Sequence, residues 1–183
     1  NYVRNAVKAT VDAYTGDVKL YGWDTKDPML KAWSKAFPGS VRPLSEISGD
    51  LMAHIRYPQD FLKVQRELLT EYHVTNPGDF YSGSDKWRVP RDPAVANQDQ
   101  PVVFQSIAMP GEAEAAFSIT TPFVPASNNE AGREILRGLL AVDADAGNQA
   151  GKPAEDYGLL RLLEALRLRV KDVDFTARQI TVR

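Results

Sequence analysis

Cysteine is absent from this chain of 183 residues. Its absence excludes thiol catalysis, disulfide bonds and thiolate zinc sites together. An excess of charge of one sign is missing as well, because 22 Lys and Arg residues face 24 Asp and Glu residues and leave a formal net charge of -2. This balance gives the chain no global attraction to nucleic acid or to an anionic membrane.

Long hydrophobic runs are also missing, and no stretch approaches the length that spans a bilayer. Neither a starting Met nor a secretory signal opens the sequence, which begins Asn1-Tyr2 and ends Val182-Arg183. The apolar fraction of 43% is ordinary and is enough for the core of one domain plus an appendage. We therefore expect a soluble piece of a larger protein, and no self-sufficient enzyme.

Apolar and polar residues alternate near the start of the chain. Val7, Ala9 and Val11 are separated by single polar residues, and residues 18–20 continue the alternation after Thr15-Gly16-Asp17. Period-two alternation is typical of strands with one buried face, and the Gly tolerates the positive φ of a tight turn. The pattern predicts a β-hairpin that buries its Val and Ala residues.

Two helices follow in the pattern. Asp27 can cap the first helix and Pro28 fits its first turn, while Met29, Trp33 and Phe37 share one face at spacings of four. The second helix is predicted over residues 61–72 from apolar residues at helical spacing, and Asn76-Pro77-Gly78 closes it. These apolar positions are Phe61, Leu62, Val64, Leu68, Leu69 and Tyr72.

The remaining elements are shorter. Residues 43–53 suggest a loop with a short helix, and residues 79–100 an ordered loop with a helical turn. A strand pair is predicted over residues 102–109 and 116–120, a loop over 122–129, a short helix over 130–137, a strand over 139–142 and a loop over 143–156.

The tail changes character at residue 157. Leucines crowd residues 159–168 at helical spacing, although a strand beside residues 139–142 is an open alternative for residues 157–163. Residues 179–182 have a strand-like pattern. The fold class we predict is α+β: an antiparallel sheet built from hairpins, packed against two or more helices, with a C-terminal helix-strand appendage.

Many short motifs follow one another in a fixed order along the first 163 residues. They include residues 4–14, Trp23-Asp24, residues 35–39, residues 53–58, residues 72–75, Phe80-Tyr81, Trp87-Arg88-Val89-Pro90, Met109-Pro110-Gly111, residues 122–125 and Tyr157-Gly158. This set resembles uncharacterised protein family 0182, a family of large prokaryotic multi-pass membrane proteins with a big extracytoplasmic region.

The resemblance implies a non-catalytic extracytoplasmic domain with an interaction or assembly role, placed on the outer side of the membrane in its parent protein. Its partners are then expected among envelope or membrane protein components. It implies no cofactor, because the activity of the family is not established. The expected domains are residues 1–156 as this α+β domain and residues 157–183 as a separate tail.

The tail itself resembles tyrosine recombinases of the integron integrase type, over residues 160–183. In that family a helix carries the first catalytic arginine, which holds the scissile phosphate, and Arg161 matches that position. The matching Lys, His-x-x-Arg and nucleophilic Tyr are missing, and an arginine alone cannot perform the transesterification. The alternative function is therefore a catalytically incomplete DNA-binding fragment.

The two resemblances overlap at residues 157–163, where we expect a junction between unlike sequences. Nucleic acid is not an expected partner, because Glu164, Asp172 and Asp174 interrupt the tail's arginines. Homo-oligomers through the open strand edges of the tail are an additional expectation.

Candidate sites are few. His54 and His73 lack ligand spacing, and we expect structural roles for both. The acidic loop of Asp143, Asp145, Glu155 and Asp156 matches no calcium motif, so no metal site is predicted. We expect Asp12, Asp17, Asp24 and Asp27 to stabilise turns and cap helices. The alternative is that two of them form the carboxylate pair of a hydrolase.

Aromatic residues are the remaining candidates. Trp23, Trp33, Tyr81 and Trp87 could line a groove for a peptide or glycan, with core packing as the alternative for each. No Gly-x-Ser-x-Gly elbow surrounds Ser82 or Ser84, and no phosphate loop or dinucleotide fingerprint occurs. The sequence thus predicts no catalytic residue.

Overall fold

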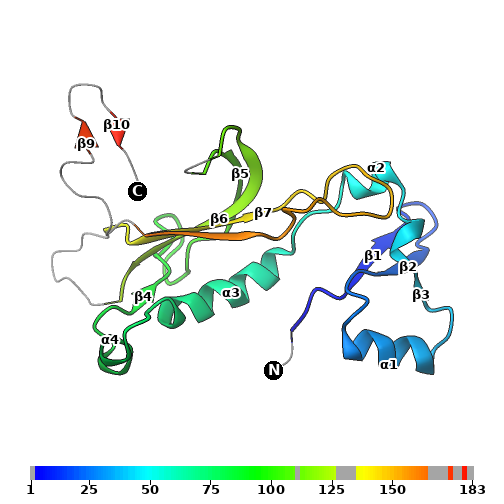
Figure 1. Ribbon diagram of the computed structural model, residues 1–183, viewed down its shortest axis with the longest axis horizontal. Coiled ribbons are helices and arrows are strands. Elements are labelled where there is room, and N and C mark those ends of the chain that lie inside the picture. Colours follow the sequence, from blue (N-terminus) through cyan, green and yellow to red (C-terminus); the bar gives the residue numbers. More distant parts are fainter. Residues whose placement is uncertain (1–2, 110–111, 127–134, 165–172, 175–178, 181–183) are drawn as a thin grey trace. The chain divides into compact units, whose positions relative to one another are not determined.

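The computed structural model describes residues 3–109, 112–126, 135–164, 173–174 and 179–180 (Figure 1). The chain forms two compact units. Unit 1 comprises Asn1–Phe61 and Asp145–Tyr157, and unit 2 comprises Leu62–Ala144 and Gly158–Arg183. The predicted α+β class is confirmed. The expected boundary between residues 156 and 157 rests on the two resemblances and stays a prediction.

A three-stranded sheet forms the frame of unit 1. Strands β1 (Val7–Val11) and β2 (Val18–Gly22) pair antiparallel, and β3 (Val41–Arg42) adds parallel to β2, in the order β1-β2-β3. The turn uses Gly16 at φ +77°, a region that L side chains rarely adopt. The predicted hairpin is therefore confirmed.

The hairpin buries the opposite face from the one predicted. Val7, Ala9 and Val11 are exposed, while Lys8 on the other face is half-buried and Tyr21 is buried. Tyr21 packs in a core cluster with Ile47, Met52 and Ala146. Alternation identifies two faces but not which one meets the core, and here the large Tyr21 ring decides it.

Helical segments follow the hairpin in unit 1. α1 (Pro28–Ala36) confirms the first predicted helix, and the 3-10 helix η1 (Leu44–Glu46) and α2 (Gly49–Met52) lie within residues 43–53, where a loop with one short helix was expected. Asp27 caps α1, because its Oδ1 accepts a 2.7 Å hydrogen bond from Leu30 N.

The loop Asp145–Tyr157 returns to unit 1 and packs very closely on it. A Cβ at Gly49 would lie 2.6 Å from the carbonyl oxygen of Asn148. A Cβ at Gly151 would lie 2.8 Å from Ser45 Cα. Both contacts are with backbone, so only glycine allows this approach.

Within the described residues, unit 2 is built on an antiparallel sheet of five strands. Its order is β4-β6-β7-β8, with β5 also paired to β6. The strands of this sheet are β4 (Trp87–Arg88), β5 (Val103–Ile107), β6 (Ala116–Pro125), β7 (Gly138–Asp143) and β8 (Leu160–Glu164). The strands β9 (Val173–Asp174) and β10 (Gln179–Ile180) form a separate antiparallel pair.

The sheet confirms three predicted strands and corrects one loop. Residues 122–125 were expected to be a loop, but they continue β6 and pair with β7 and β4. Pro122 and Pro125 lack an N–H donor, and both are nevertheless part of the strand. Phe123 and Val124 are buried, and their burial favours the longer strand.

The tail adds a strand where the leucine pattern favoured a helix. β8 pairs antiparallel with β7, which places Leu163 opposite Leu139 and Leu162 opposite Leu140. The open alternative over residues 157–163 is thus settled as strand for residues 160–163. The rest of the predicted tail helix lies outside the described residues, while β10 confirms part of the strand-like run at 179–182.

The longest helix follows the prediction in position but only partly in its buried face. α3 (Gln59–Tyr72) crosses the boundary between the units after Phe61, and α4 (Pro77–Ser82) is capped by Asn76, which was expected to close the preceding helix. α3 buries Leu62, Arg66 and Thr70. Leu62 is therefore buried as predicted and Phe61 and Leu69 are half-buried. The remaining predicted positions Val64, Leu68 and Tyr72 are exposed.

The predicted short helix over residues 130–137 is only partly covered by the structure. Residues 130–134 lie outside the described residues, and residues 135–137 are not helical and lead into β7. The glycine that opens β7 packs tightly, because a Cβ on Gly138 would lie 2.8 Å from the Trp87 ring.

Candidate functional site

An open apolar groove of about 610 Å³ lies in unit 1 between α1 and the sheet. Apolar side chains dominate both of its walls. The lining residues are Arg4, Ala6, Val7, Leu20, Asp27, Met29, Leu30, Trp33, Phe37, Ser40 and Val41.

The α1 wall presents large apolar side chains to solvent. Met29 is 53% exposed, Trp33 is 55% exposed, and the Trp33 and Phe37 rings stack with centroids 5.0 Å apart. Leu30 also lines the groove, but it is buried against the sheet near Gly22. The predicted shared face of Met29, Trp33 and Phe37 therefore exists, but it faces the groove and not the core.

The sheet wall consists of the outward side chains of three strands. The register places Val7 opposite Gly22, Ala9 opposite Leu20 and Val11 opposite Val18, so all of these residues share one face. Val11 is 65% exposed, and Val18 is also exposed. The groove is thus the covered end of a wider apolar face that continues into solvent.

The opposite face of the hairpin holds a lysine among aromatic rings. Lys8 Nζ donates to Tyr157 Oη at 2.9 Å and to the Arg56 carbonyl oxygen at 3.4 Å. It also lies 5.0 Å from the centroid of the Trp23 ring. Burial lowers the pKa of Lys8 to about 8 and raises the pKa of Tyr157.

This arrangement ties three parts of unit 1 together. β1 supplies Lys8, the segment between α2 and α3 supplies Arg56, and the returning loop supplies Tyr157. Arg56 also pairs with Asp145 at the start of that loop, at 3.3 Å. Lys8 is a partly neutral amine near pH 8, but its contacts serve to hold the loop in place.

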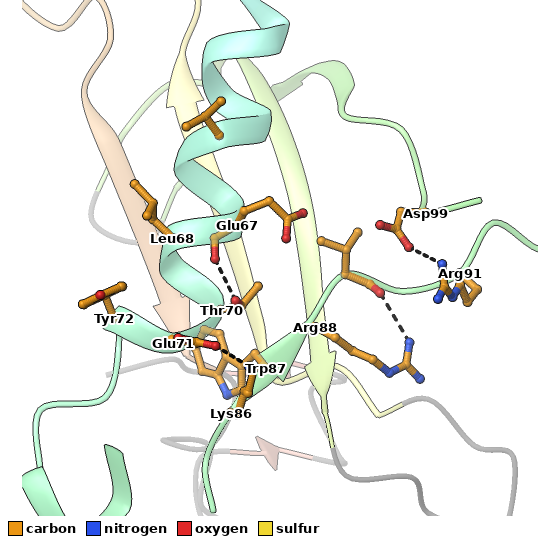
Figure 2. A pocket seen from close by; sticks show the side chains of 12 residues that line it. Glu67, Leu68, Thr70, Glu71, Tyr72, Lys86, Trp87, Arg88, Arg91 and Asp99 are labelled. Atoms are coloured by element: carbon orange, nitrogen blue, oxygen red, sulfur yellow. Dashed lines mark hydrogen bonds and ion pairs between the residues drawn. The ribbon is translucent and has the colours of Figure 1, made fainter. Parts of the chain in front are cut away.

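A second hollow, of about 630 Å³, lies in unit 2 between α3 and the chain around β4 (Figure 2). Charged side chains of both signs line much of it, and Figure 2 shows ion pairs between some of them. Lys86 pairs with Glu71, and Arg91 pairs with Asp99 at 2.8 Å. Because these charges are matched within the chain, the hollow has no excess charge to offer an ionic ligand.

Trp87 lies in this hollow but belongs to the core of unit 2. It is 2% exposed and stacks on His73 with centroids 3.5 Å apart. His73 Nδ1 lies 2.7 Å from the Leu69 carbonyl oxygen. Within the described residues, Trp87 Nε1 and His73 Nε2 have no hydrogen-bond partner.

The structure does not bring the four candidate aromatics into one groove. Within unit 1, Trp33 lines the apolar groove and Trp23 contacts Lys8 on the other side of the sheet. Within unit 2, Trp87 is buried, and Tyr81 on α4 is 88% exposed beside a small hollow of about 200 Å³. Ligand binding by any of them stays a prediction.

Arg161 is engaged by carboxylates within the sheet. Its Nη1 lies 2.8 Å from Asp143 Oδ2, and its Nη2 lies 3.1 Å from Glu112 Oε1. Ser118 Oγ donates to the same Asp143 at 3.4 Å. The tail resemblance assigned Arg161 to binding a phosphate. In the structure it lies in β8 and neutralises the buried carboxylate of Asp143 in β7.

The other candidate residues have local duties. His54 Nδ1 lies 2.7 Å from the Asp50 carbonyl oxygen on an exposed turn. Asp12 accepts from Tyr14 N and Thr15 N in the hairpin turn, and Asp145 accepts from Gly147 N. In the described part of the chain, no group of three His, Asp or Glu residues is placed to hold a metal ion.

Sequence reasoning missed the sheet wall of the groove, formed by Val7, Leu20 and Val41. The signal was present in the period-two pattern, but it was assigned to the core. Among the described residues, no helix combines the length and the apolar character needed to cross a membrane.

Comparisons with known proteins identify relatives over most of the chain. The description "Uncharacterised protein family (UPF0182)" matches residues 1–169. The chain is 57% identical to a UPF0182 protein of Kineococcus radiotolerans over 171 residues, which cover 90% of this chain and 17% of that protein. A UPF0182 protein of Paenarthrobacter aurescens is 56% identical over 165 residues, which cover 90% of this chain and 16% of the relative.

A more distant relative, a UPF0182 protein of Tropheryma whipplei, is 48% identical over 179 residues, which cover 89% of the chain and 19% of the relative. The chain thus spans about one sixth of the length of the curated relatives it matches. No solved structure matches it. The family match runs through residues 157–163, where a junction was expected, and includes the whole of β8. This chain therefore belongs to the uncharacterised protein family UPF0182.

Proposed function

We propose that this chain is a non-catalytic interaction domain of a larger multi-pass membrane protein, and that it lies on the extracytoplasmic side of the membrane. The observation that carries the proposal is the outward apolar face of unit 1. Met29, Trp33 and Phe37 line a concave groove and are each more than half exposed. Apolar surface of this kind marks an interaction site, because burying it releases free energy.

The partner we propose is an apolar segment from the rest of the same polypeptide. The relatives extend far beyond the matched region, which covers only 16–19% of their length. A partner on the same polypeptide is present at a high effective concentration, so a modest groove is enough to hold it. The function is therefore assembly of the larger protein.

The non-catalytic part of the proposal is supported by the duties of the candidate catalytic groups. Asp27 caps α1, Arg161 balances Asp143, and His73 packs against Trp87. Each group is held by its neighbours in a structural contact. The extracytoplasmic part is supported by the resemblance to the family alone.

The proposed function is tested by asking whether the remainder of a full-length relative binds this chain. The remainder of the Kineococcus radiotolerans relative is co-expressed with this chain as a separate, tagged polypeptide, and retention is measured after detergent extraction. We expect the chain to be retained and Trp33→Glu to lose at least about tenfold in retention, since a charge in the groove disfavours apolar docking.

The control is Tyr14→Glu, because Tyr14 is fully exposed at the hairpin turn, away from the groove. It should be retained like the unchanged chain. No retention of the unchanged chain, or equal retention of Trp33→Glu, would overturn the proposed function.

A further inference from the structure

β1 is an edge strand of the unit 1 sheet. The order β1-β2-β3 gives it β2 as its single neighbour among the described residues. An edge strand presents backbone N–H and C=O groups that can pair with another strand.

The backbone hydrogen bonds at the two ends of the hairpin show which N–H and C=O groups of β1 face the open edge. Asp12 N donates to the Asp17 carbonyl at 2.9 Å, and Trp23 N donates to the Ala6 carbonyl at 2.8 Å. Since bonded positions alternate along an antiparallel pair, residues 6, 8, 10 and 12 direct their peptide groups at β2. The N–H and C=O groups of Val7, Ala9 and Val11 therefore point away from the sheet.

The same three residues also expose their side chains. Val7, Ala9 and Val11 form the outer row of the apolar face, and Val7 lines the groove. Sheet edges are commonly protected by proline or by outward charge, and none of these three positions carries either. Among the described residues, outward backbone groups without a strand partner and exposed apolar side chains thus coincide at one edge.

We propose that β1 receives an added strand: an extended segment of the same polypeptide, with apolar residues at alternate positions, pairs with the free edge of β1. This inference rests on the proposed function and specifies the form of the partner. Main-chain hydrogen bonds to Val7, Ala9 and Val11 provide affinity. Alternate side chains of the added strand lie on the apolar face beside them, where they select for apolar residues.

A docked helix would be a poorer fit to this surface. It could fill the groove with side chains, but its backbone groups are used within the helix and would leave the β1 edge unpaired. A strand satisfies the apolar face and the edge together. The remaining alternative occupant is a second copy of β1, since an antiparallel pair centred on Ala9 would be self-complementary.

Hydrogen exchange tests the added strand in the complex captured by the remainder of the relative. We expect the amides of Val7, Ala9 and Val11 to exchange at least about tenfold more slowly in the complex than in the isolated chain at low concentration. The amides of Lys8 and Thr10, which already face β2, serve as internal references and should change much less.

A matched pair of variants at one position provides the second readout. Ala9→Pro removes an outward N–H donor, which an edge strand tolerates, while Ala9→Val keeps the donor. We expect Ala9→Pro to lower retention about tenfold and Ala9→Val to leave it unchanged. Should Ala9→Pro fail to fold, the exchange rates in the unchanged chain decide alone.

The outcomes separate this inference from the proposed function. Retention that depends on Trp33 but leaves the outward amides of β1 fast-exchanging would overturn the added strand and keep the interaction role. Loss of all retention would overturn both. Protection of the same amides in the isolated chain, appearing with a dimeric mass as concentration rises, would assign the edge to a second copy and contradict the proposed occupant.

Discussion

Lys8 is a charged residue on the face of the hairpin that packs against the core of unit 1. Its aliphatic stem crosses partly buried surface, and its ammonium group meets the Tyr157 hydroxyl, the Arg56 carbonyl and the Trp23 ring. This contact set explains why the sheet can turn its Val and Ala residues outward. The residue that sequence reasoning treated as the polar side of the strand is the one that packs inward.

We expect the free energy of unfolding to rise as the pH increases from about 8 towards 10. The folded pKa of Lys8, about 8, lies below its ordinary value of 10.5, so the unfolded chain binds more protons between these values. The stabilising contribution is complete above pH 10.5 and is lost as the pH falls through 8.

Tyr157 sets the upper end of the pH range in which the free energy of unfolding rises. Its pKa is raised above the ordinary value of 10.0, so its contribution to stability is present below pH 10 and declines above it. Urea unfolding between pH 7 and pH 10 measures the slope, with Lys8→Met as the variant without the titrating amine. An equal slope in Lys8→Met would contradict this account.

Arg161 illustrates a residue whose neighbours determine its role. The side chains of Arg161 and Asp143 are 22% and 5% exposed, so Arg161→Ala leaves an almost buried carboxylate without its cation. We expect this change to cost about 3–5 kcal/mol of the free energy of unfolding.

The control for this prediction is Arg91→Ala. Arg91 and Asp99 form an ion pair of the same length, but their side chains are 64% and 40% exposed, and solvent screening reduces its value to less than about 1 kcal/mol. Urea unfolding compares the two variants. A similar small loss in the free energy of unfolding for both variants would contradict the role of Arg161 in neutralising Asp143.

The elements of this chain were predictable where local signals and packing agree. The hairpin, α1 and its Asp27 cap follow from alternation, capping and helical spacing. β8 was not, because its leucines also fit a helix and only pairing with β7 selects the strand. The groove was missed for a related reason: a period gives two faces, and tertiary packing chooses which one is buried.

Gly138 offers a test of packing at the level of one strand. A Cβ there would lie 2.8 and 2.9 Å from two atoms of the Trp87 ring and 3.2 Å from the Leu163 carbonyl oxygen. Because Trp87 is buried and cannot move freely, we expect Gly138→Ala to destabilise the chain by about 1–3 kcal/mol.

Gly22→Ala is the matched control in another strand. Its Cβ would meet Leu30 at 3.4 Å and Val41 at 3.6 Å, which are ordinary contacts. Thermal unfolding of both variants should show a lower midpoint for Gly138→Ala alone. A midpoint for Gly138→Ala equal to that of the unchanged chain would contradict the packing described for Trp87.

At the scale of the whole molecule, the chain crosses three times between its two units. It leaves unit 1 within α3, returns for Asp145–Tyr157, and leaves again at Gly158 with φ +81°. Each unit has its own sheet. The relatives are about six times longer than the matched region, which supports the proposal that the open apolar face of unit 1 binds another part of the polypeptide.

The most direct measurement is cysteine accessibility in a cysteine-free version of the full-length Kineococcus radiotolerans relative that carries this chain at the matching position. Single cysteines replace Met29 in the groove and Tyr14 at the exposed turn, and a membrane-impermeant maleimide labels intact cells. We predict labelling of Tyr14→Cys on intact cells, and labelling of Met29→Cys in the isolated chain but not in the full-length protein. Equal labelling of Met29→Cys in both proteins, or labelling of Tyr14→Cys only after lysis, would contradict the account.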